Sequence, residues 1–458
     1  MIENDAFKLL LINLFHLNPD DIANIFCTTF NKMMVLLVTL ADKHQACPYC
    51  GFTAPKIKEY VTKEITHSAL TTQKCIIKYR ARRYKCPCCG KTYYEFNPFV
   101  FKSQKISILT VHNILKDLKD FNETFTSVAR RYHVSPTSVS TIFDNHVDIG
   151  RNPLPEIINF DEVYAFKSEK SKYVCVLLDF KKQIPVDVLP NRKKEYLLNY
   201  FQKIPLEERK KVKYACSDMY EVYRDVAHKV FPCSCMLLDY FHLSQDFHRK
   251  MNEVRIKVMK GYKDDKASDE YYLLKKFNWL LFKNPEDEDK YGRLFDVERE
   301  RKYNSHFKSY MNYYDLRRKL LEINNDLTIC YSLKLELVDF YSKSTIDNAQ
   351  VNLEHLIRSC IDTNIEEMIA FSNNLINWKQ EIINSFTIVG TEYKVEADKG
   401  QVVVCNKKVN NAIIENRNKI IKCIKNNANG YTNWSRFRNR VMYVLDPNTT
   451  FSLEPREK

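Results

Sequence analysis

The sequence contains little glycine and no long apolar run. Only 8 of its 458 residues are glycine. No stretch of about eighteen consecutive apolar residues occurs, so we expect no membrane-spanning helix and no membrane partner. The N-terminus lacks a basic region followed by an apolar stretch and a small-residue cleavage site, which argues against a secretory signal. There is also no internal repeat and no low-complexity tract. These absences favour an ordinary globular protein.

The length of the chain and its cysteines indicate the organisation and the compartment. A chain of 458 residues is too long for one compact core and should form about two to four domains. Its 15 cysteines are odd in number, and most lie in apolar surroundings, as Cys175, Cys216 and Cys235 do. A secreted disulfide scaffold is short and regularly spaced, so we expect a reducing, cytoplasmic environment.

The formal net charge is +14, and the basic residues are clustered. Residues 74–105 contain nine Lys or Arg and one acid, Glu95, and residues 402–445 contain nine and one acid, Glu415. Such a local excess favours a polyanion partner, because neutralised phosphates release condensed counterions. Solvated basic faces give the same pattern, so charge alone does not decide between the two interpretations.

Two C-P-x-C-G knuckles predict a metal site in the first hundred residues. One contains Cys47 and Cys50, and the other contains Cys86 and Cys89. In each knuckle a tight turn directs two thiolates to one point, and two knuckles supply the four soft ligands that tetrahedral zinc prefers. Residues 75–84 alternate as a strand of a zinc ribbon does. The ligand set stays open, because other candidates lie nearby: Cys88, His44 and Cys75.

Residues 125–143 have the pattern of two short helices joined by a turn. Ser135 and Pro136 are a cap and a proline at the first helical position, which together start the second helix. This is the layout of a helix-turn-helix whose second helix enters the major groove of DNA. An ordinary helical hairpin is the alternative. The candidate DNA contacts on the two helices are Arg130, Arg131, Thr137, Ser138 and Ser140.

After a linker with Pro153 and Pro155, short apolar runs predict strands. Three strands are expected at 157–164, 173–180 and 184–189, followed by a helix at 194–203, a strand at 212–218, a helix at 220–231 and a strand at 236–239. This is the element order of an RNase H-like mixed sheet, in which the first strand lies beside the fourth.

Acidic residues lie at matching places on these strands. Asp161 is in the first strand and Asp218 ends the fourth, so we expect the two carboxylates to face one another. Adjacent buried carboxylates repel, and a pair of Mg²⁺ ions removes that penalty and can clamp the oxygens of a phosphodiester. For either aspartate alone, a strand-edge or turn role is the simpler interpretation. Asp239 and His242 form a further motif on the last strand. The histidine would contact phosphate, orient a carboxylate or position water, or would simply pack in the core.

The rest of the chain predicts a helical insertion and a basic C-terminal region. Residues 243–384 are almost free of glycine and rich in Lys, Glu, Leu, Phe and Tyr, which indicates helices with one loop at 284–287. Its tryptophans, Trp279 and Trp378, are interpreted as core residues rather than platforms for bases. Residues 393–404 have the pattern of a hairpin.

An amphipathic helix is expected at 411–426, with Ile413, Ile420 and Ile424, and Ile414 and Ile421 beside them, on its buried face. Glu415 is the only acid among residues 402–445. Its ordinary role would be an ion pair with Lys419 one turn later. A carboxylate among cations also keeps its charge and can bind metal while its neighbours hold phosphates. The candidate DNA contacts on this helix are Arg417, Lys419 and Lys422.

Together these motifs resemble the DDE transposases of bacterial insertion sequences, specifically the ISL group. The resemblance covers nearly the whole chain, through the knuckles, the helix pair and the segments F-D-E-V at 160–163, S-D-M-Y at 217–220, D-Y-F-H at 239–242, N-A-I-I-E-N-R-N-K-I-I-K at 411–422 and N-G-Y-T-N-W-S-R-F-R-N-R at 429–440. It implies that Asp161, Asp218 and Glu415 form a catalytic triad that binds Mg²⁺ or Mn²⁺. Two positions depart from the family, which often has glycine where Asn416 stands and a basic residue near Asn426.

The resemblance also implies a function. The chain would bind the terminal inverted repeats of an element in double-stranded DNA, then cleave the DNA and transfer the strand to target DNA. It would act as a homodimer or a larger assembly in the bacterial cytoplasm, at the nucleoid. Two alternatives stay open, a transposase-derived repressor without catalysis and an RNase H-like nuclease without strand transfer.

The expected fold is a multidomain α/β architecture. We expect an N-terminal helical segment at 1–40, a zinc-binding module at 41–104, a helix-turn-helix at 105–150, the first part of an RNase H-like core at 151–243, an all-helical insertion at 244–390, and the final part of the core with the Glu415 helix and a basic tail at 391–458.

Overall fold

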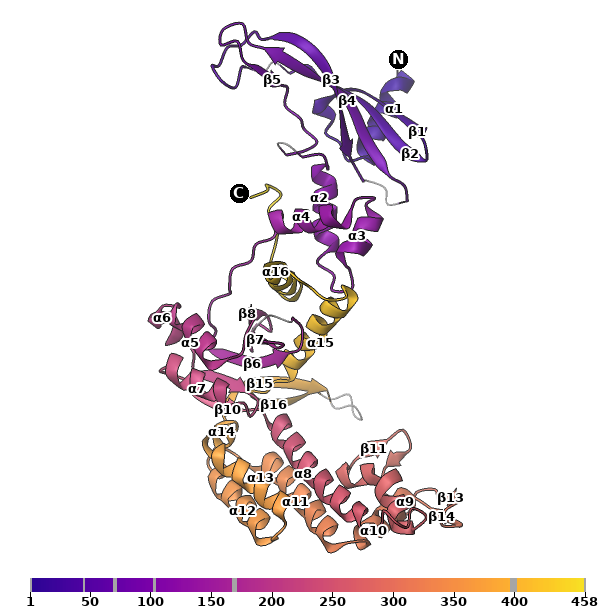
Figure 1. The fold of residues 1–458 in the computed structure, drawn as a ribbon, viewed down its shortest axis with the longest axis vertical. Helices are drawn as coiled ribbons and strands as arrows, with labels where there is room; N and C mark the ends of the chain where they lie inside the picture. The colour runs from indigo at the N-terminus through magenta and orange to yellow at the C-terminus, as the bar shows by residue number, and fades with distance from the viewer. Residues whose placement is uncertain are drawn as a thin grey trace.

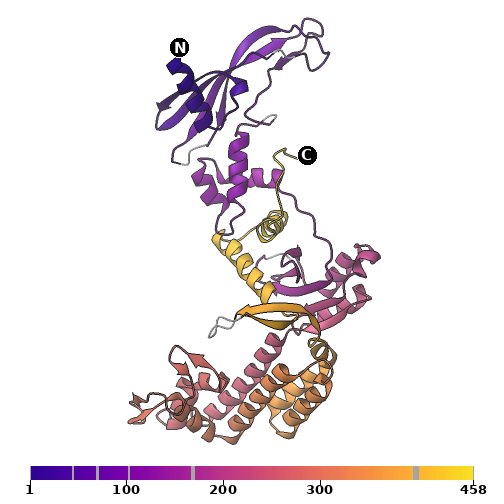
Figure 2. The ribbon, with the colours of Figure 1, turned by 180° about the vertical axis from the view of Figure 1, so that it is seen from behind.

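The computed structural model of the chain describes residues 2–43, 46–68, 72–101, 104–166, 171–395 and 402–456. The molecule is elongated, and its parts follow one another along the long axis (Figure 1). The N-terminal sheet lies at one end, a second sheet lies near the middle, and a bundle of helices lies at the other end. The view from behind shows the C-terminal helices between the N-terminal part and the middle sheet (Figure 2). Among the described residues, no helix is both long and apolar enough to cross a membrane.

One helix and five strands form the N-terminal unit: α1 (Ile2–Leu14), β1 (Ile22–Phe30), β2 (Met33–Leu40), β3 (Lys56–Thr66), β4 (Cys75–Lys85) and β5 (Thr92–Tyr94). The strand order is β1-β2-β4-β3, and β5 pairs with the end of β4. Apolar side chains of β4 pack against α1 and its neighbouring strands. The strand predicted at 75–84 is therefore confirmed.

The prediction of a helical segment over residues 1–40 is wrong beyond Leu14. Residues 22–40 form the β1–β2 hairpin, whose turn holds Asn31 at φ 48° and Lys32 at φ 60°. Positive φ at both central residues matches the twist of the paired strands, and the flanking residues are mostly β-branched, aromatic or aliphatic. Because β2 pairs with β4, residues 1–40 and 41–104 form one unit.

Three short helices follow the N-terminal unit: α2 (Ile108–Asp117), α3 (Phe125–Arg131) and α4 (Pro136–His146). The predicted start of the last helix is confirmed, because the Ser135 side chain caps it and Pro136 is its first residue. The turn between α3 and α4 contains His133 at φ 53°. Val128 and Phe143 are buried, so the apolar faces predicted for this helix pair pack in a shared core.

The middle sheet has five strands: β6 (Ile157–Val163), β7 (Val174–Asp179), β8 (Pro185–Leu189), β9 (Tyr214–Ser217) and β10 (Cys235–Leu238). Their order is β10-β9-β6-β7-β8. The first three strands form an antiparallel meander, and β9 and β10 run parallel to β6. The predicted adjacency of the first and fourth strands is thus confirmed. The helices α5 (Lys194–Gln202) and α6 (Leu206–Arg209) connect β8 to β9, and α7 (Glu221–Val230) connects β9 to β10. Helices α5 and α7 pack on one face of the sheet.

The bundle at the far end from the N-terminal unit contains seven α-helices among the described residues: α8 (Tyr240–Lys260), α9 (Asp269–Lys276), α10 (Tyr313–Glu322), α11 (Asn325–Lys343), α12 (Ala349–Asp362), α13 (Glu366–Asn377) and α14 (Lys379–Asn384). It begins at Tyr240, a few residues earlier than predicted, because α8 follows β10 almost directly. Trp378 is 3% exposed in its core, and Trp279 is half-buried against the same core, as expected.

The prediction that this insertion is all-helical is wrong. A short 3-10 helix, η2 (Asn278–Phe282), precedes two small hairpins, which pair Glu288–Asp289 (β11) with Gly292–Arg293 (β12) and Lys302–Asn304 (β13) with Ser309–Met311 (β14). Gly292, the first residue of β12, has φ 96°, and Lys308 in the turn between β13 and β14 has φ 48°. The hairpins form because this charged stretch lacks the apolar period that would bury one face of a helix.

The chain returns to the middle sheet through an antiparallel hairpin, β15 (Ile388–Val395) and β16 (Val402–Lys408), and ends with α15 (Ala412–Asn427) and α16 (Trp434–Leu445). The predicted hairpin is confirmed, and its turn at 396–401 lies outside the described residues. The helix predicted at 411–426 is also confirmed, and the five isoleucines of its predicted buried face differ only in how deeply they are buried. Ile414, Ile421 and Ile424 are buried, whereas Ile413 and Ile420 are half-buried, because the helix also turns Asn418 towards β6.

The sequence did not predict α16, which lies in the segment interpreted only as basic and aromatic. Its apolar residues share one core with α2, α3, α4, α15 and a face of the middle sheet. Arg436 pairs with Asp144 at 2.6 Å, and the Lys119 ammonium donates to backbone oxygens of Asp446 and Thr449. The predicted boundary between a separate domain 105–150 and the core is therefore wrong, since the C-terminal helix packs the two together.

Candidate functional site

Three aspartates lie at one edge of the middle sheet, where its parallel strands end. Asn159 of β6 is paired with Cys216 of β9, and Ser217 of β9 is paired with Leu238 of β10. The same register, continued by one or two residues, aligns Asp161, Asp218 and Asp239. The first two were predicted to face one another, and their charges are close enough for Asp218 to raise the pKa of Asp161.

Asp161 is buried, with 8% of the residue exposed. Its carboxylate accepts a hydrogen bond of 2.7 Å from the Asn418 side-chain amide and one of 2.7 Å from the backbone N–H of Glu162. Burial, together with the charges of Asp218, Glu162 and Glu415, raises the pKa of Asp161 to about 7, although the hydrogen bond from the Glu162 backbone opposes the rise. The side chain therefore occupies a place where a carboxylate needs a nearby cation to stay ionised at neutral pH.

Asp218 and Asp239 experience the same effect. Burial raises the pKa of Asp218 to about 6, with the Glu162 charge acting in the same direction and His242 and Arg192 opposing it. Burial also raises the pKa of Asp239. Among the described residues, one oxygen of each carboxyl, Oδ1 of Asp218 and Oδ2 of Asp239, is buried without a hydrogen-bond partner. Buried acceptors of this kind are costly unless a ligand satisfies them.

Glu415 and His242 complete this edge of the sheet. Nε2 of His242 lies 3.8 Å from Oε1 of Glu415 and 3.7 Å from Oδ2 of Asp239. These three residues bring their ligand atoms within 4.8 Å of one another. His242 lies in the first turn of α8 and not on a strand as predicted, because β10 ends at Leu238.

The alternative role of Glu415, an ion pair with Lys419, does not describe its surroundings. The Lys419 ammonium instead lies 3.4 Å from the side-chain oxygen of Asn416. The Glu415 side chain is 32% exposed and faces His242. The glutamate therefore belongs to the edge where the aspartates lie, in the first turn of α15.

A pair of buried asparagines fixes the start of α15 against β6. The Asn159 amide donates to the side-chain oxygen of Asn411 at 2.7 Å and to the backbone oxygen of Asn410 at 2.8 Å. Asn411 is fully buried, and its carbonyl accepts the Glu415 N–H at 2.9 Å. The sequence analysis did not predict a role for Asn159, Asn411 and Asn418. Their position could have indicated one, because each is a polar amide on the otherwise apolar, buried face of a strand or helix.

We name the five side chains Asp161, Asp218, Asp239, His242 and Glu415 the carboxylate centre. Four carboxyl groups and an imidazole form a donor set of oxygen and nitrogen atoms, and among the described residues one buried atom each of Asp218, Asp239 and His242 has no hydrogen-bond partner. Hard divalent cations such as Mg²⁺ and Mn²⁺ prefer carboxylate oxygens, and their charge would offset the repulsion between buried carboxylates. The residues present thus fit a divalent cation.

The four predicted cysteines form a second cluster, at the tip of the N-terminal sheet. Sγ of Cys47 lies 3.7 Å from Sγ of Cys89, and Sγ of Cys50 lies 3.5 Å from Sγ of Cys86. All four sulfurs lie within 4.8 Å of one another. In both knuckles the glycine N–H donates to the carbonyl of the first cysteine, and the two glycines have φ of 75° and 69°.

The alternative ligands have different outcomes. Cys88 is exposed and is not part of the four-sulfur cluster. Cys75 is buried among apolar residues of the N-terminal core. His44 lies outside the described residues. The prediction that Cys47, Cys50, Cys86 and Cys89 come together is therefore confirmed.

The predicted DNA contacts differ in solvent exposure and in the bonds that they already form within the protein. Arg130 and Thr137 are exposed, and Ser138 and Ser140 are half-buried on α4. Arg131 forms ion pairs with Asp117 and Glu123, so its charge is used within the helical unit. On α15, Lys419 and Lys422 are exposed, and Arg417 donates to the backbone oxygen of Gln183 at 3.2 Å.

Sequence comparisons relate the chain to known proteins. Residues 158–397 match the ISL3 group of the DDE type, a family described as transposase. The match includes Asp161, Asp218, Asp239 and His242 and ends before Glu415. The chain is also 20% identical over 409 residues to the transposase for insertion sequence element IS1001 of Bordetella parapertussis, covering 89% of this chain and 90% of that protein.

Proposed function

This chain belongs to the ISL3 family of DDE transposases, and we propose that it is an insertion-sequence transposase that cleaves and joins DNA at the carboxylate centre. The observation that carries the proposal is the alignment of Asp161 and Asp218 at the end of adjacent strands, with Glu415 on a helix anchored to the same sheet.

We assign the catalytic triad to Asp161, Asp218 and Glu415, which would hold two divalent cations, Mg²⁺ or Mn²⁺. Bound there, the cations would neutralise charge on the attacking and leaving oxygens of a phosphodiester. The raised pKa values of the buried aspartates support this assignment, since a cation would keep them ionised at neutral pH.

The chain's own side chains position the reaction. Asn418 holds one oxygen of Asp161, and the Asn159–Asn411 bond holds Glu415 over the strand ends. His242 offers Nε2, which is buried and without a hydrogen-bond partner among the described residues, to a phosphate oxygen. Lys419 and Lys422 lie exposed along the same helix to contact the DNA backbone.

In the proposed reaction, water attacks a phosphodiester at the element end, the P–O3′ bond breaks and a 3′-hydroxyl is freed. That hydroxyl then attacks a target phosphodiester in line, so one P–O bond forms as another breaks. No nucleophilic Ser, Tyr or Cys is needed. The two element ends would be held together by a homodimer or a larger assembly.

We assign recognition of the element ends to the N-terminal unit and the α3–α4 pair, read as a helix-turn-helix. Four clustered thiols are the ligand set of structural zinc, which would hold the two knuckles together. Arg130 and Thr137 offer exposed contacts on adjacent helices, while Arg131 supports the fold of the unit.

Replacement of Glu415 by Gln tests the triad. We expect DNA joining to fall by at least about 1,000-fold, because a metal centre supplies several kcal/mol of transition-state stabilisation. The assay measures strand transfer by the full chain, with Mg²⁺ and a duplex carrying the inverted repeat that flanks its coding region. The matched control is Glu366→Gln, because the Glu366 side chain is 87% exposed on α13.

Joining that survives in Glu415→Gln at the wild-type rate would remove Glu415 from the centre. For the wild-type chain, cleavage without joining would identify a nuclease. Binding of the end duplex without cleavage would identify a repressor.

A further inference from the structure

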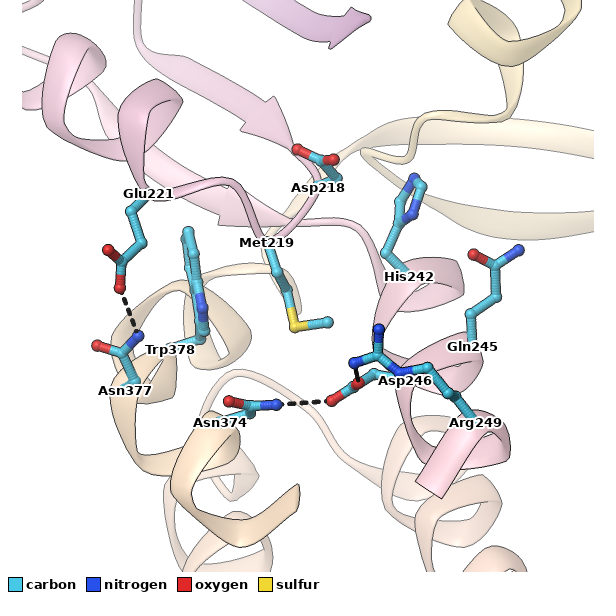
Figure 3. A pocket seen from close by; sticks show the side chains of 10 residues that line it. All are labelled: Asp218, Met219, Glu221, His242, Gln245, Asp246, Arg249, Asn374, Asn377 and Trp378. Atoms are coloured by element: carbon cyan, nitrogen blue, oxygen red, sulfur yellow. Dashed lines mark hydrogen bonds and ion pairs between the residues drawn. The ribbon is translucent and has the colours of Figure 1, made fainter. Parts of the chain in front are cut away.

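A cavity of about 620 Å³ lies directly beside the carboxylate centre, and the reaction described above leaves its purpose unassigned. It lies between the end of β9, α8 and the α13–α14 corner of the insertion (Figure 3). Asp218 and His242 belong both to the cavity and to the centre. Its volume lies within the range of sites for small organic groups, about 300–1,000 Å³.

The charges in the cavity disfavour a phosphate. Asp218, Glu221 and Asp246 contribute three carboxyl groups to the lining, against the single guanidinium of Arg249. Arg249 is already paired with Asp246, whose other oxygen accepts a hydrogen bond of 2.7 Å from Asn374. A second anion would meet unbalanced negative charge here, so an anionic occupant is disfavoured.

The neutral groups in the lining favour a flat, hydrogen-bonding occupant. Gln245, Asn374 and Asn377 each present an amide, which can donate and accept at once, as the edge of a nucleobase does. Met219 and Trp378 add a thioether and an indole to the lining (Figure 3). Trp378 is 3% exposed and forms the back of this wall, so the half-buried thioether of Met219 offers the apolar contact for the face of an unstacked base.

The wall that carries the indole is braced. The Arg224 guanidinium lies 4.2 Å from the centre of the Trp378 ring and donates to the backbone oxygen of Asn377 at 2.8 Å. Asn377 in turn donates to Glu221 at 3.0 Å. The first turn of α7 and the insertion are thereby linked at the wall of the cavity.

We propose that this cavity receives one base of the DNA substrate, extruded from the duplex next to the phosphate that reacts at the carboxylate centre. The proposal rests on the proposed function, because it places a nucleotide beside a phosphodiester held by Asp218. A base is joined to its phosphate by a single sugar, so a phosphate at the centre brings its neighbouring base to the mouth of the cavity. The insertion thus contributes binding groups to the reaction.

The first experiment locates the base. End duplexes carry the fluorescent base 2-aminopurine at one position at a time on both sides of the cleaved bond, and the full chain is added with Ca²⁺ in place of Mg²⁺. We expect severalfold greater fluorescence at one position flanking that bond and little change elsewhere, since extrusion removes stacking. A chain that cleaves this duplex in Mg²⁺ but increases fluorescence at no position would overturn the inference and leave the proposed function intact. A chain that neither binds nor cleaves it would overturn both.

The second experiment assigns the base to this cavity. The variant Gln245→Ala/Asn377→Ala removes two lining amides on exposed residues. We expect single-turnover cleavage of the intact end duplex to fall about tenfold, because lost base contacts of this kind are worth roughly 1–3 kcal/mol. On a duplex that is abasic at the responsive position, the variant and the wild type should cleave equally. The control is Gln380→Ala, an exposed glutamine on α14 outside the cavity. A tenfold difference that persists on the abasic duplex would overturn the assignment, as would an unchanged variant.

Discussion

The cysteine cluster takes its four thiols from two turns, and each turn is closed by its own backbone hydrogen bonds. The carboxylate centre takes its side chains from three strand ends and two helices. Cys47 and Cys89, which touch, are 42 residues apart, whereas Asp161 and Asn418 are 257 residues apart. One site is prepared by local backbone geometry, and the other exists only when the sheet, the insertion and α15 are all in place.

The two sites also differ in how their ligand atoms are held before any metal binds. The four sulfurs lie against one another in a small unit that has few other apolar residues around it. The carboxyl groups are embedded in a sheet whose residues are almost all buried, and there the repulsion between them is opposed by surrounding packing. A metal would therefore stabilise the fold of the knuckles, whereas the centre should keep its fold without one.

The largest effect that separates the two regions is expected from Cys86→Ser. If the proposed zinc ion is bound there, this change should remove it and lower affinity for the end duplex at least about tenfold, because a structural zinc ion contributes folding free energy directly to a small unit. Zinc content by mass spectrometry under native conditions and duplex binding measure the two effects. Hydrogen exchange in β6 and β9 should stay at the wild-type rate.

Cys88→Ser is the matched control, since Cys88 is exposed and is not part of the cluster. It should keep both zinc and duplex binding. Zinc lost equally in both variants would exclude the four-sulfur assignment, and faster exchange in β6 of Cys86→Ser would show that the two regions are coupled after all.

An effect confined to the other region, without loss of either site, is expected from Asn418→Ala. The Asn418 amide donates to Asp161, and removal of a partner that orients a metal ligand typically costs about 10–100-fold in activity or metal affinity. Cleavage should fall by this factor and recover partly at higher Mg²⁺ concentration, while zinc content and duplex binding stay unchanged. Titration of Mg²⁺ in the cleavage assay measures it.

Asn416→Ala is the control for this change, because Asn416 is exposed two residues earlier on the same helix. Its side-chain oxygen accepts only a bond of 3.4 Å from Lys419 among the hydrogen bonds that the structure describes. Equal losses in the two variants would mean that the Asp161 contact is not what positions the carboxylate.

The contrast between the two regions also explains what the sequence predicted. The two knuckles were predicted, although the choice among nearby ligands was left open, because a C-P-x-C-G turn depends on residues that are neighbours in the chain. The strands of the middle sheet and their order were also predicted, since buried strands give short apolar runs and sheet topologies obey few rules. The register that aligns Asp161 with Asp218 follows from that order.

Other features needed contacts that are distant in the sequence. Asn411 and Asn418 are ordinary polar residues until β6 packs against them. The β1–β2 hairpin was missed because α1 precedes it and its turn, Asn31-Lys32, lacks the Asn-Gly or Asp-Gly pair typical of such turns. Helix α16 was missed because its basic residues, such as Arg438 and Arg440, suggested a surface, whereas Arg440 is 1% exposed and donates to two backbone carbonyls near α3.

The smallest expected effect concerns His67, which joins the N-terminal unit to the rest of the molecule. The imidazole is 2% exposed, with Nε2 2.9 Å from the backbone oxygen of Phe15 and Nδ1 2.9 Å from the hydroxyl of Ser107. The carbonyl can only accept, so Nε2 carries the proton and Nδ1 accepts from Ser107.

Burial lowers the pKa of His67, and the nearby His16 adds to this effect. Because the unfolded chain binds this proton more readily than the folded one, the contribution of His67 to stability is complete above its unfolded pKa and is lost as the pH falls. Acidification from about pH 7.5 to about pH 5.5 should therefore lower the free energy of opening at this junction by about 1 kcal/mol.

Hydrogen exchange across β3 and α2, corrected for the intrinsic pH dependence of exchange, measures the change. The slope should vanish in His67→Gln and persist in His355→Gln, whose side chain is 75% exposed in the insertion. If the free energy of opening depends on pH equally strongly in His67→Gln, another group is responsible for the acid sensitivity of this junction.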